Sequence, residues 1–158
     1  PICSLGQGLG IAIGMALSAK MDDKNYRTYC VMGDGELQEG SVWEAAMAAS
    51  NYRLDNLCAI IDRNKLQIDG STENVMALEP LAEKWSSFGW NVVEIDGHDH
   101  NDIIDAFAIA RATIGQPTLV LANTVMGKGV KSIENDNKWH GKVPSRDDLD
   151  KFLNELYC

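Results

Sequence analysis

Apolar runs typical of strands alternate with helix-like segments along almost the whole of this chain. Strands are expected at residues 28–32, 57–62, 91–95 and 118–124, with helical segments between them. Strands that alternate with helices predict parallel β-α-β units. Because the run at residues 57–61 is apolar throughout, that strand is expected to be covered on both faces. We therefore predict an α/β fold: a doubly wound, mainly parallel sheet with helices on both faces.

Helices are expected at residues 5–20, 41–51, 78–88 and 102–114, and a last helix begins near residue 146. Two serine-acid pairs have the spacing of a capping box: Ser41 with Glu44, and Ser145 with Asp148. Four apolar residues are expected to form the buried stripe of the last helix: Leu149, Phe152, Leu153 and Leu156.

Three glycines recur at intervals of four in the first expected helix: Gly6, Gly10 and Gly14. Glycine inside a helix costs up to about 1 kcal/mol relative to alanine, so three in register suggest that another backbone or a ligand packs close by. For Gly10 and Gly14 we favour tight helix packing.

Composition excludes several classes of protein. The 158 residues are 45% hydrophobic and 23% charged, which predicts one domain over residues 1–158. Apolar runs all fall short of the roughly 20 residues that span a bilayer, and no leader opens the sequence, so we expect a cytoplasmic protein without a membrane partner. The net charge of −9 argues against nucleic acid as a partner. The four cysteines form no CxxC pair, and reduced thiols are expected.

The most informative local motif is Gly33-Asp34-Gly35, which follows one expected strand and precedes a helix. In doubly wound folds, ligands bind at the carboxyl ends of strands, so Asp34 is expected to face the ligand crevice. Glycine on either side lets the backbone approach a bound group, and the amide of Gly35 can face a phosphate oxygen. The alternative is an ordinary surface turn.

Asn64 follows the next expected strand, at a distance from Gly35 that fits one helix and one strand. Asn64 is therefore expected beside Asp34 at neighbouring strand ends. A carboxylate and an amide oxygen suit a hard cation that also binds diphosphate oxygens and water, so magnesium fits better than zinc.

Five segments together resemble the transketolase family. They are SLGQGLGIAIGMA, GDGELQEGSVWEA, DRNKLQIDG, IDGHD and WHG, in that order along the chain. The resemblance covers nearly the whole chain and implies a thiamine-diphosphate-binding fold. It also implies that Asp34, Asn64 and the backbone carbonyl of Leu66 bind Mg²⁺ (or Ca²⁺), and that Gly35 donates its amide to the diphosphate.

The same resemblance implies roles for three further residues. Leu5 and Ile68 would form apolar walls against the thiazolium ring, although plain core packing is an alternative. His140, in the WHG segment, would contact the diphosphate and act catalytically as a proton shuttle near the donor substrate. The alternative for His140 is a surface loop histidine.

The sequence departs from the family pattern at its start. Cys3 stands where transketolases typically carry a glycine beside the aminopyrimidine, and the family's upstream histidines would lie before Pro1. We therefore expect a domain truncated at its N-terminus. In the family, the glutamate that activates the cofactor comes from a separate domain, and no segment here resembles that domain. The chain alone is accordingly expected to have negligible activity.

The resemblance implies a transketolase that transfers a two-carbon ketol unit between sugar phosphates, in the pentose phosphate pathway. A C-terminal transketolase subunit or domain is the expected partner, within a homodimer or heterotetramer. One alternative is an enzyme like 1-deoxyxylulose-5-phosphate synthase, which shares the fold and the GDG motif. Another is a non-catalytic cofactor-binding fragment.

Overall fold

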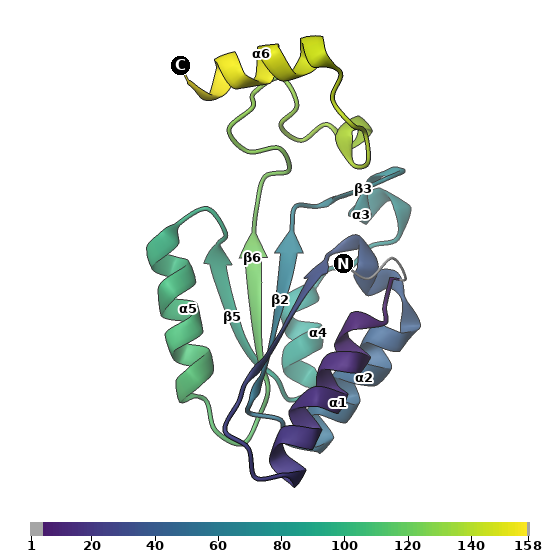
Figure 1. The fold of residues 1–158 in the computed structure, drawn as a ribbon. Coiled ribbons are helices and arrows are strands. Elements are labelled where there is room, and N and C mark those ends of the chain that lie inside the picture. Colours follow the sequence, from purple (N-terminus) through teal and green to yellow (C-terminus); the bar gives the residue numbers. More distant parts are fainter. Residues whose placement is uncertain (1–4, 158) are drawn as a thin grey trace.

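A four-stranded parallel sheet organises the computed structural model, which describes residues 5–157. The strands are β1 (Thr28–Gly33), β2 (Leu57–Arg63), β5 (Asn91–Asp96) and β6 (Thr118–Asn123). They lie in the order β1-β2-β6-β5 (Figure 1), and each neighbouring pair is parallel. The predicted α/β architecture is confirmed, and the predicted strand boundaries agree to within one residue.

The register places the carboxyl ends of the strands at one edge of the sheet. Gly33 pairs with Asp62, and Asn123 pairs with both Arg63 and Asp96. Residues that directly follow the strands therefore meet at this edge, which is where an open α/β sheet binds ligands.

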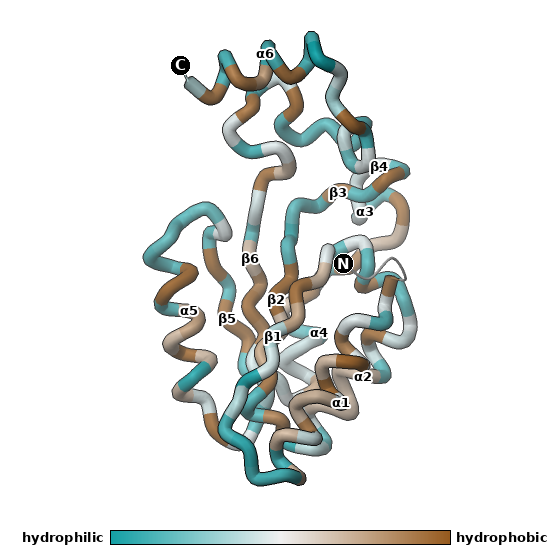
Figure 2. The backbone as a smooth tube through the Cα atoms, in the orientation of Figure 1, coloured by the Kyte–Doolittle hydropathy of each residue, from teal (hydrophilic) through white to brown (hydrophobic). Residues whose placement is uncertain are grey.

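Helices cover both faces of the sheet. On one face α1 (Gly8–Met21), α2 (Gly40–Asn51) and α4 (Leu81–Ser87) bury the larger core, which contains the fully buried Trp85. On the other face α5 (His100–Ala112) packs on Cys58 and Val120. Figure 2 shows the apolar strands between these two layers. Among the described residues, no helix is both long and apolar enough to span a membrane.

Short elements lie beyond the carboxyl ends of the strands (Figure 1). They are η1 (Gly35–Gln38), the antiparallel pair β3 (Leu66–Gln67) and β4 (Gly70–Ser71), α3 (Thr72–Val75), η2 (Asn137–Trp139) and α6 (Arg146–Leu156). These elements surround the edge at which the predicted ligand site lies.

The final helix confirms one prediction and corrects another. Ser145 and Asp148 form the expected capping box. The predicted buried stripe is wrong, because only Phe152 is buried, where it packs edge-on against Trp139. The other three residues of the stripe remain 38–55% exposed: Leu149, Leu153 and Leu156.

The start of α2 also differs from prediction. The helix begins at Gly40 with Glu39 at its N-cap, and no side chain caps it, so the predicted Ser41–Glu44 capping box is wrong. The Ser41 hydroxyl instead donates to the carbonyl of Gly6, at 3.0 Å.

The first helix is shorter than predicted. Gly6 adopts a φ of 77°, a left-handed conformation that favours glycine, and α1 begins only at Gly8. Gly10 and Gly14 are exposed, and a Cβ added at either would meet no atom within 4 Å. Within residues 5–157 nothing packs closely on these two glycines, so the predicted tight packing is wrong.

The cysteine prediction holds for the residues that the structure describes. Cys30 and Cys58 are buried and free, and burial raises the pKa of the Cys58 thiol to about 11. Cys3, the residue where the family pattern has glycine, lies outside the described residues, as does Cys158.

Candidate diphosphate and metal site

Asp34 lies at the tip of β1 and is almost fully buried, with 1% of its surface exposed. Its amide donates to the carbonyl of Asp62, at 3.2 Å. Oδ1 accepts a hydrogen bond from the Gly35 amide at 2.8 Å, and Oδ2 accepts bonds from Arg63 Nη1 at 2.9 Å and the Lys65 amide at 2.6 Å. The carboxylate orientation is therefore fixed by three donors.

The turn after β2 comes directly against Asp34. Both sequence neighbours of Asn64 donate to Asp34 Oδ2, namely the Arg63 side chain and the Lys65 backbone. Lys65 reaches this position through a left-handed conformation with a φ of 65°. The half-buried Asn64 turns its own Oδ1 onto the Leu66 amide, at 2.9 Å. The two strand ends that the sequence predicts to be neighbours are thus joined by hydrogen bonds.

The oxygen atoms at these strand ends suit a hard cation. A carboxylate has about four lone-pair positions that can accept a hydrogen bond or bind a cation. Three of these positions on Asp34 accept hydrogen bonds, so one position, on Oδ1, stays available. Asn64 Oδ1 likewise keeps one position beside its bond to Leu66. Oxygen ligands of this kind suit Mg²⁺ and Ca²⁺. No cluster of three histidine, cysteine or acidic residues able to hold a metal occurs within residues 5–157, so a cation here needs additional oxygens, such as those of a diphosphate.

The two glycines that flank Asp34 have different surroundings. Gly33 is exposed, and a Cβ there would meet no atom within 4 Å. At Gly35 a Cβ would lie 3.1 Å from Cβ of Gln67 in β3, so the absence of a side chain allows this close approach. The Gly35 amide donates to Asp34 here, and the bond predicted to a phosphate oxygen would require that amide to be shared or exchanged.

Leu5 and Ile68 are both exposed, by 58% and 73% respectively. Core packing, the alternative considered for these residues, is therefore wrong. Gly6, next to Leu5, is connected to η1, because its amide donates to Glu36 Oε1 at 2.9 Å. The two apolar side chains are thus free to contact a ligand or another chain.

His140 is exposed and directly follows η2. Its segment is connected to the turn between β3 and β4, because Asn137 Nδ2 donates to the carbonyl of Ile68, at 3.0 Å. The sequence did not single out Asn137. This bond brings the segment of His140 to the turn that carries Ile68. Both segments lie beyond the carboxyl ends of the strands (Figure 1).

Arg63 is the main site residue that sequence reasoning missed. It ends β2 with only 2% of its surface exposed, and its guanidinium bonds to Asp34, Thr72, Glu73 and Glu79. Burial alone would lower the pKa of Arg63, but the bonds to Glu79, Asp34 and Glu73 outweigh it and raise that pKa. The one available signal was a charged pair, Asp62 and Arg63, at the end of a strand whose first five residues are apolar.

Comparisons with known proteins identify the family of this chain. Residues 2–156 match the family model of the transketolase thiamine diphosphate binding domain. The chain is 48% identical over 153 residues to an apulose-4-phosphate transketolase subunit of Phocaeicola vulgatus, and the match covers 97% of this chain and 54% of that protein. It is 42% identical over 155 residues to the transketolase of Homo sapiens, which covers 98% of this chain and 24% of that protein.

Solved structures give the same result. The crystal structure of transketolase from Campylobacter jejuni superposes with a TM-score of 0.90 at 31% identity, over 97% of this chain and 25% of that one. The chain thus spans about half the length of the Phocaeicola vulgatus relative and about a quarter of the human transketolase. The family match over nearly the whole chain, together with the parallel sheet and the polar site at its carboxyl edge, shows that this chain belongs to the transketolase family as a thiamine diphosphate binding domain.

Proposed function

We propose that this chain binds thiamine diphosphate through a divalent cation and forms half of a composite transketolase site. The observation that carries this proposal is the orientation of Asp34, whose carboxylate is fixed by three donors and keeps one acceptor position on Oδ1. Mg²⁺ usually binds to one or two carboxylates together with phosphate oxygens and water. A single oriented carboxylate at the strand edge is therefore suited to a cation that arrives with a diphosphate.

The residues of this chain would divide the work of binding. Asp34, Asn64 and the backbone carbonyl of Leu66 would hold the cation, while the Gly33-Asp34-Gly35 turn would let the diphosphate approach the backbone. Leu5 and Ile68 are exposed apolar side chains that would exclude water from the ring of the cofactor. When bound, thiamine diphosphate supplies the electron sink of the reaction.

His140 would hold or move a proton on the donor sugar phosphate. Imidazole is the side chain best suited to exchange protons near neutral pH. The connection from Asn137 to Ile68 supports this role, because it joins the segment of His140 to a turn assigned to the cofactor.

The complete reaction would require a second domain or subunit. The Phocaeicola vulgatus relative is itself named as one subunit of a transketolase, and this chain spans about half of it. We propose a C-terminal transketolase subunit or domain as the partner, in a cytoplasmic homodimer or heterotetramer that transfers a two-carbon ketol unit between sugar phosphates. The chain alone would then be inactive. The transketolase names of both relatives favour this reaction over that of 1-deoxyxylulose-5-phosphate synthase.

Calorimetry with Mg²⁺ and thiamine diphosphate tests the proposal, with the full-length polypeptide and its partner subunit. Asp34→Ala removes the oriented carboxylate and is expected to weaken cofactor binding by at least about 100-fold. Asp105→Ala changes an exposed carboxylate on α5 and serves as the matched control. Unchanged affinity in Asp34→Ala would rule out this site, and absence of binding by the wild-type complex would overturn the proposal.

A further inference from the structure

Arg63 connects the candidate cation site to a separate segment of the chain. Its Nη1 donates to Asp34 Oδ2 at 2.9 Å and to Thr72 Oγ1 at 2.8 Å. Its Nη2 donates to Glu73 Oε1 at 2.9 Å and to Glu79 Oε1 at 2.7 Å. One buried guanidinium therefore joins the tip of β1 to residues 72–79, which include α3.

The charges around Arg63 do not cancel. Three carboxylates face one guanidinium, which leaves two negative charges in the cluster of Asp34, Arg63, Glu73 and Glu79. The Lys65 ammonium offsets part of that remainder at Glu79, and a divalent cation on Asp34 would offset the rest. The cluster is thus electrostatically suited to accept a cation even though an arginine lies beside the proposed ligand.

Arg63 also determines which oxygen of Asp34 is available. Arg63 and the Lys65 amide together use both lone pairs of Oδ2, so only Oδ1 can bind a cation. Without the guanidinium, only the amides of Gly35 and Lys65 would hold the carboxylate, and Oδ2 would regain one free position. Fixing the orientation before binding removes an entropic cost from the binding step.

Stability alone does not account well for this arrangement. Replacing a buried ion cluster by well-packed apolar residues is often neutral or stabilising, so a buried arginine is weak evidence for a purely structural role. The guanidinium touches a proposed cation ligand directly, at 2.9 Å. A function in orienting that ligand explains why the charge lies at this position.

We propose that Arg63 is a positioning residue for the divalent cation: it directs Oδ1 of Asp34 toward the cation and couples cation binding to the order of residues 72–79. This inference rests on the proposed function of Asp34 as a cation ligand. Coupling of this kind is reciprocal, so ordering of residues 72–79 would in turn strengthen cation binding.

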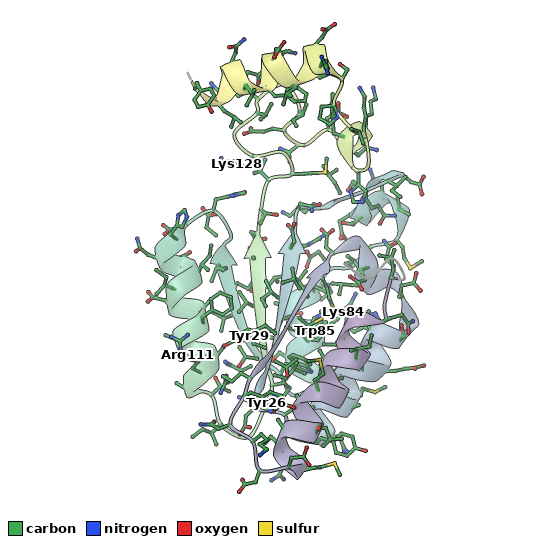
Figure 3. All side chains as sticks on the ribbon, in the orientation of Figure 1. Tyr26, Tyr29, Lys84, Trp85, Arg111 and Lys128 are labelled. Carbon is green, nitrogen blue, oxygen red and sulfur yellow. The ribbon has the colours of Figure 1, made fainter. Side chains whose placement is uncertain are left out.

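Titration with Mn²⁺ in the presence of thiamine diphosphate, followed by electron paramagnetic resonance, tests the positioning role. The assay uses the full-length polypeptide with its partner subunit. Arg63→Met is expected to weaken Mn²⁺ binding by about 10–100-fold, which is the usual effect of losing a residue that orients a metal ligand. Arg63→Lys keeps the charge and should recover part of that loss. Arg111→Met, on the exposed side of α5 (Figure 3), is the matched control.

The outcomes separate the two proposals. If the wild-type complex binds no Mn²⁺ with thiamine diphosphate, the proposed function itself fails. If the wild type binds and folded Arg63→Met binds equally well, the positioning role is wrong. A purely structural residue would lower the melting temperature without changing the affinity of the folded fraction, and that result also overturns the proposal.

Two further measurements apply even where Arg63→Met does not fold. Glu79→Gln alters the exposed end of the cluster and is expected to weaken Mn²⁺ binding by about 2–10-fold, with little loss of structure. In the wild-type protein, Mn²⁺ with thiamine diphosphate should slow hydrogen exchange of residues 72–79. Unchanged exchange there, together with unchanged affinity in Glu79→Gln, would disprove the coupling.

Discussion

At the tips of β1 and β2, Asp34 and Arg63 are buried and bonded to each other, whereas at the tips of β5 and β6 the side chains of Asp96, His98 and Asn123 face solvent. Asp34 and Arg63 are only 1% and 2% exposed. Asp96, the last residue of β5, and His98 are exposed and line an open cavity of about 520 Å³. Lys128 also lines this cavity, and Figure 3 shows it above β6.

The difference arises from what the chain does after each strand. After β2 it folds back through β3, β4 and α3, which cover the tip of β1 and bring Thr72 and Glu73 to Arg63. After β5 it enters α5 within a few residues, and its acidic side chains bond to nearby backbone amides: Asp96 accepts from His98, and Asp99 accepts from Asn101. Polar residues after a strand can thus form either a buried cluster or only a turn, according to whether a later part of the chain covers them.

The two regions should differ most in their response to loss of a side chain. Arg63→Ala is expected to lower the free energy of unfolding by about 3–5 kcal/mol, because it leaves the Asp34 carboxylate buried without the guanidinium that pairs with it. His98→Ala removes one exposed acceptor of the Val125 amide and should cost only about 0.5 kcal/mol. Urea unfolding followed by circular dichroism measures both values. Equal losses would show that the contrast in burial has no energetic meaning.

A backbone change sharpens the comparison, because the β5–β6 tips are tightly packed at one glycine. A Cβ on Gly97 would lie 2.5 Å from Cγ2 of Thr124 and 3.1 Å from the carbonyl of Asn123. Gly97→Ala is therefore expected to destabilise by about 1–3 kcal/mol. Gly14→Ala, at an exposed helical position with open space, should instead stabilise by up to about 1 kcal/mol. Thermal unfolding of both variants tests the sign, and a stabilising Gly97→Ala would contradict this packing.

Acid should weaken the contacts of Arg63 at the β1–β2 tips. The pKa of Glu79 lies below its ordinary value of 4.5, because the Leu81 amide and then Arg63 bond to its carboxylate. For Glu73, burial raises the pKa, but the Leu78 amide and Arg63 outweigh it and lower that pKa. Since the unfolded chain takes up these protons more readily, the stability from both groups is present above about pH 4.5 and is lost as the pH falls through their lower folded pKa values.

The size of this acid effect is small because both carboxylates are at least one-third exposed. Each should contribute less than about 1 kcal/mol. Melting temperatures measured between pH 6 and pH 3 should fall less steeply in the double variant Glu73→Gln, Glu79→Gln than in the wild type. Parallel curves would show that Arg63 does not stabilise the ionised carboxylates.

The sequence was sufficient to predict the strands and the meeting of their tips. Apolar runs gave β1, β2, β5 and β6 to within one residue, and the spacing after them correctly brought the Asp34 and Asn64 turns together. Local patterns failed where distant contacts decide the structure. The start of α1 depends on a bond from Gly6 to Glu36, thirty residues away, and periodicity in a short window does not reveal such a bond.

Arg63 could not be predicted for the same reason. An arginine between an aspartate and an asparagine usually faces solvent. Its partners Thr72, Glu73 and Glu79 follow 9–16 residues later and reach it only because β3 and β4 reverse the chain. The exposed side chains of Leu149, Leu153 and Leu156 show the opposite error, since an amphipathic pattern predicts which face is apolar and not whether anything covers it.

The position of β1 in the sheet has a consequence for handling the purified domain. Among residues 5–157 no strand pairs with its outer edge, and Tyr29 and Val31 beside that edge are 45% and 72% exposed. An open apolar edge can pair with the same edge of another molecule. Mutual repulsion from a net charge of −9 opposes this aggregation, and added salt screens it. Light scattering should therefore rise with ionic strength, and Val31→Lys should suppress that rise.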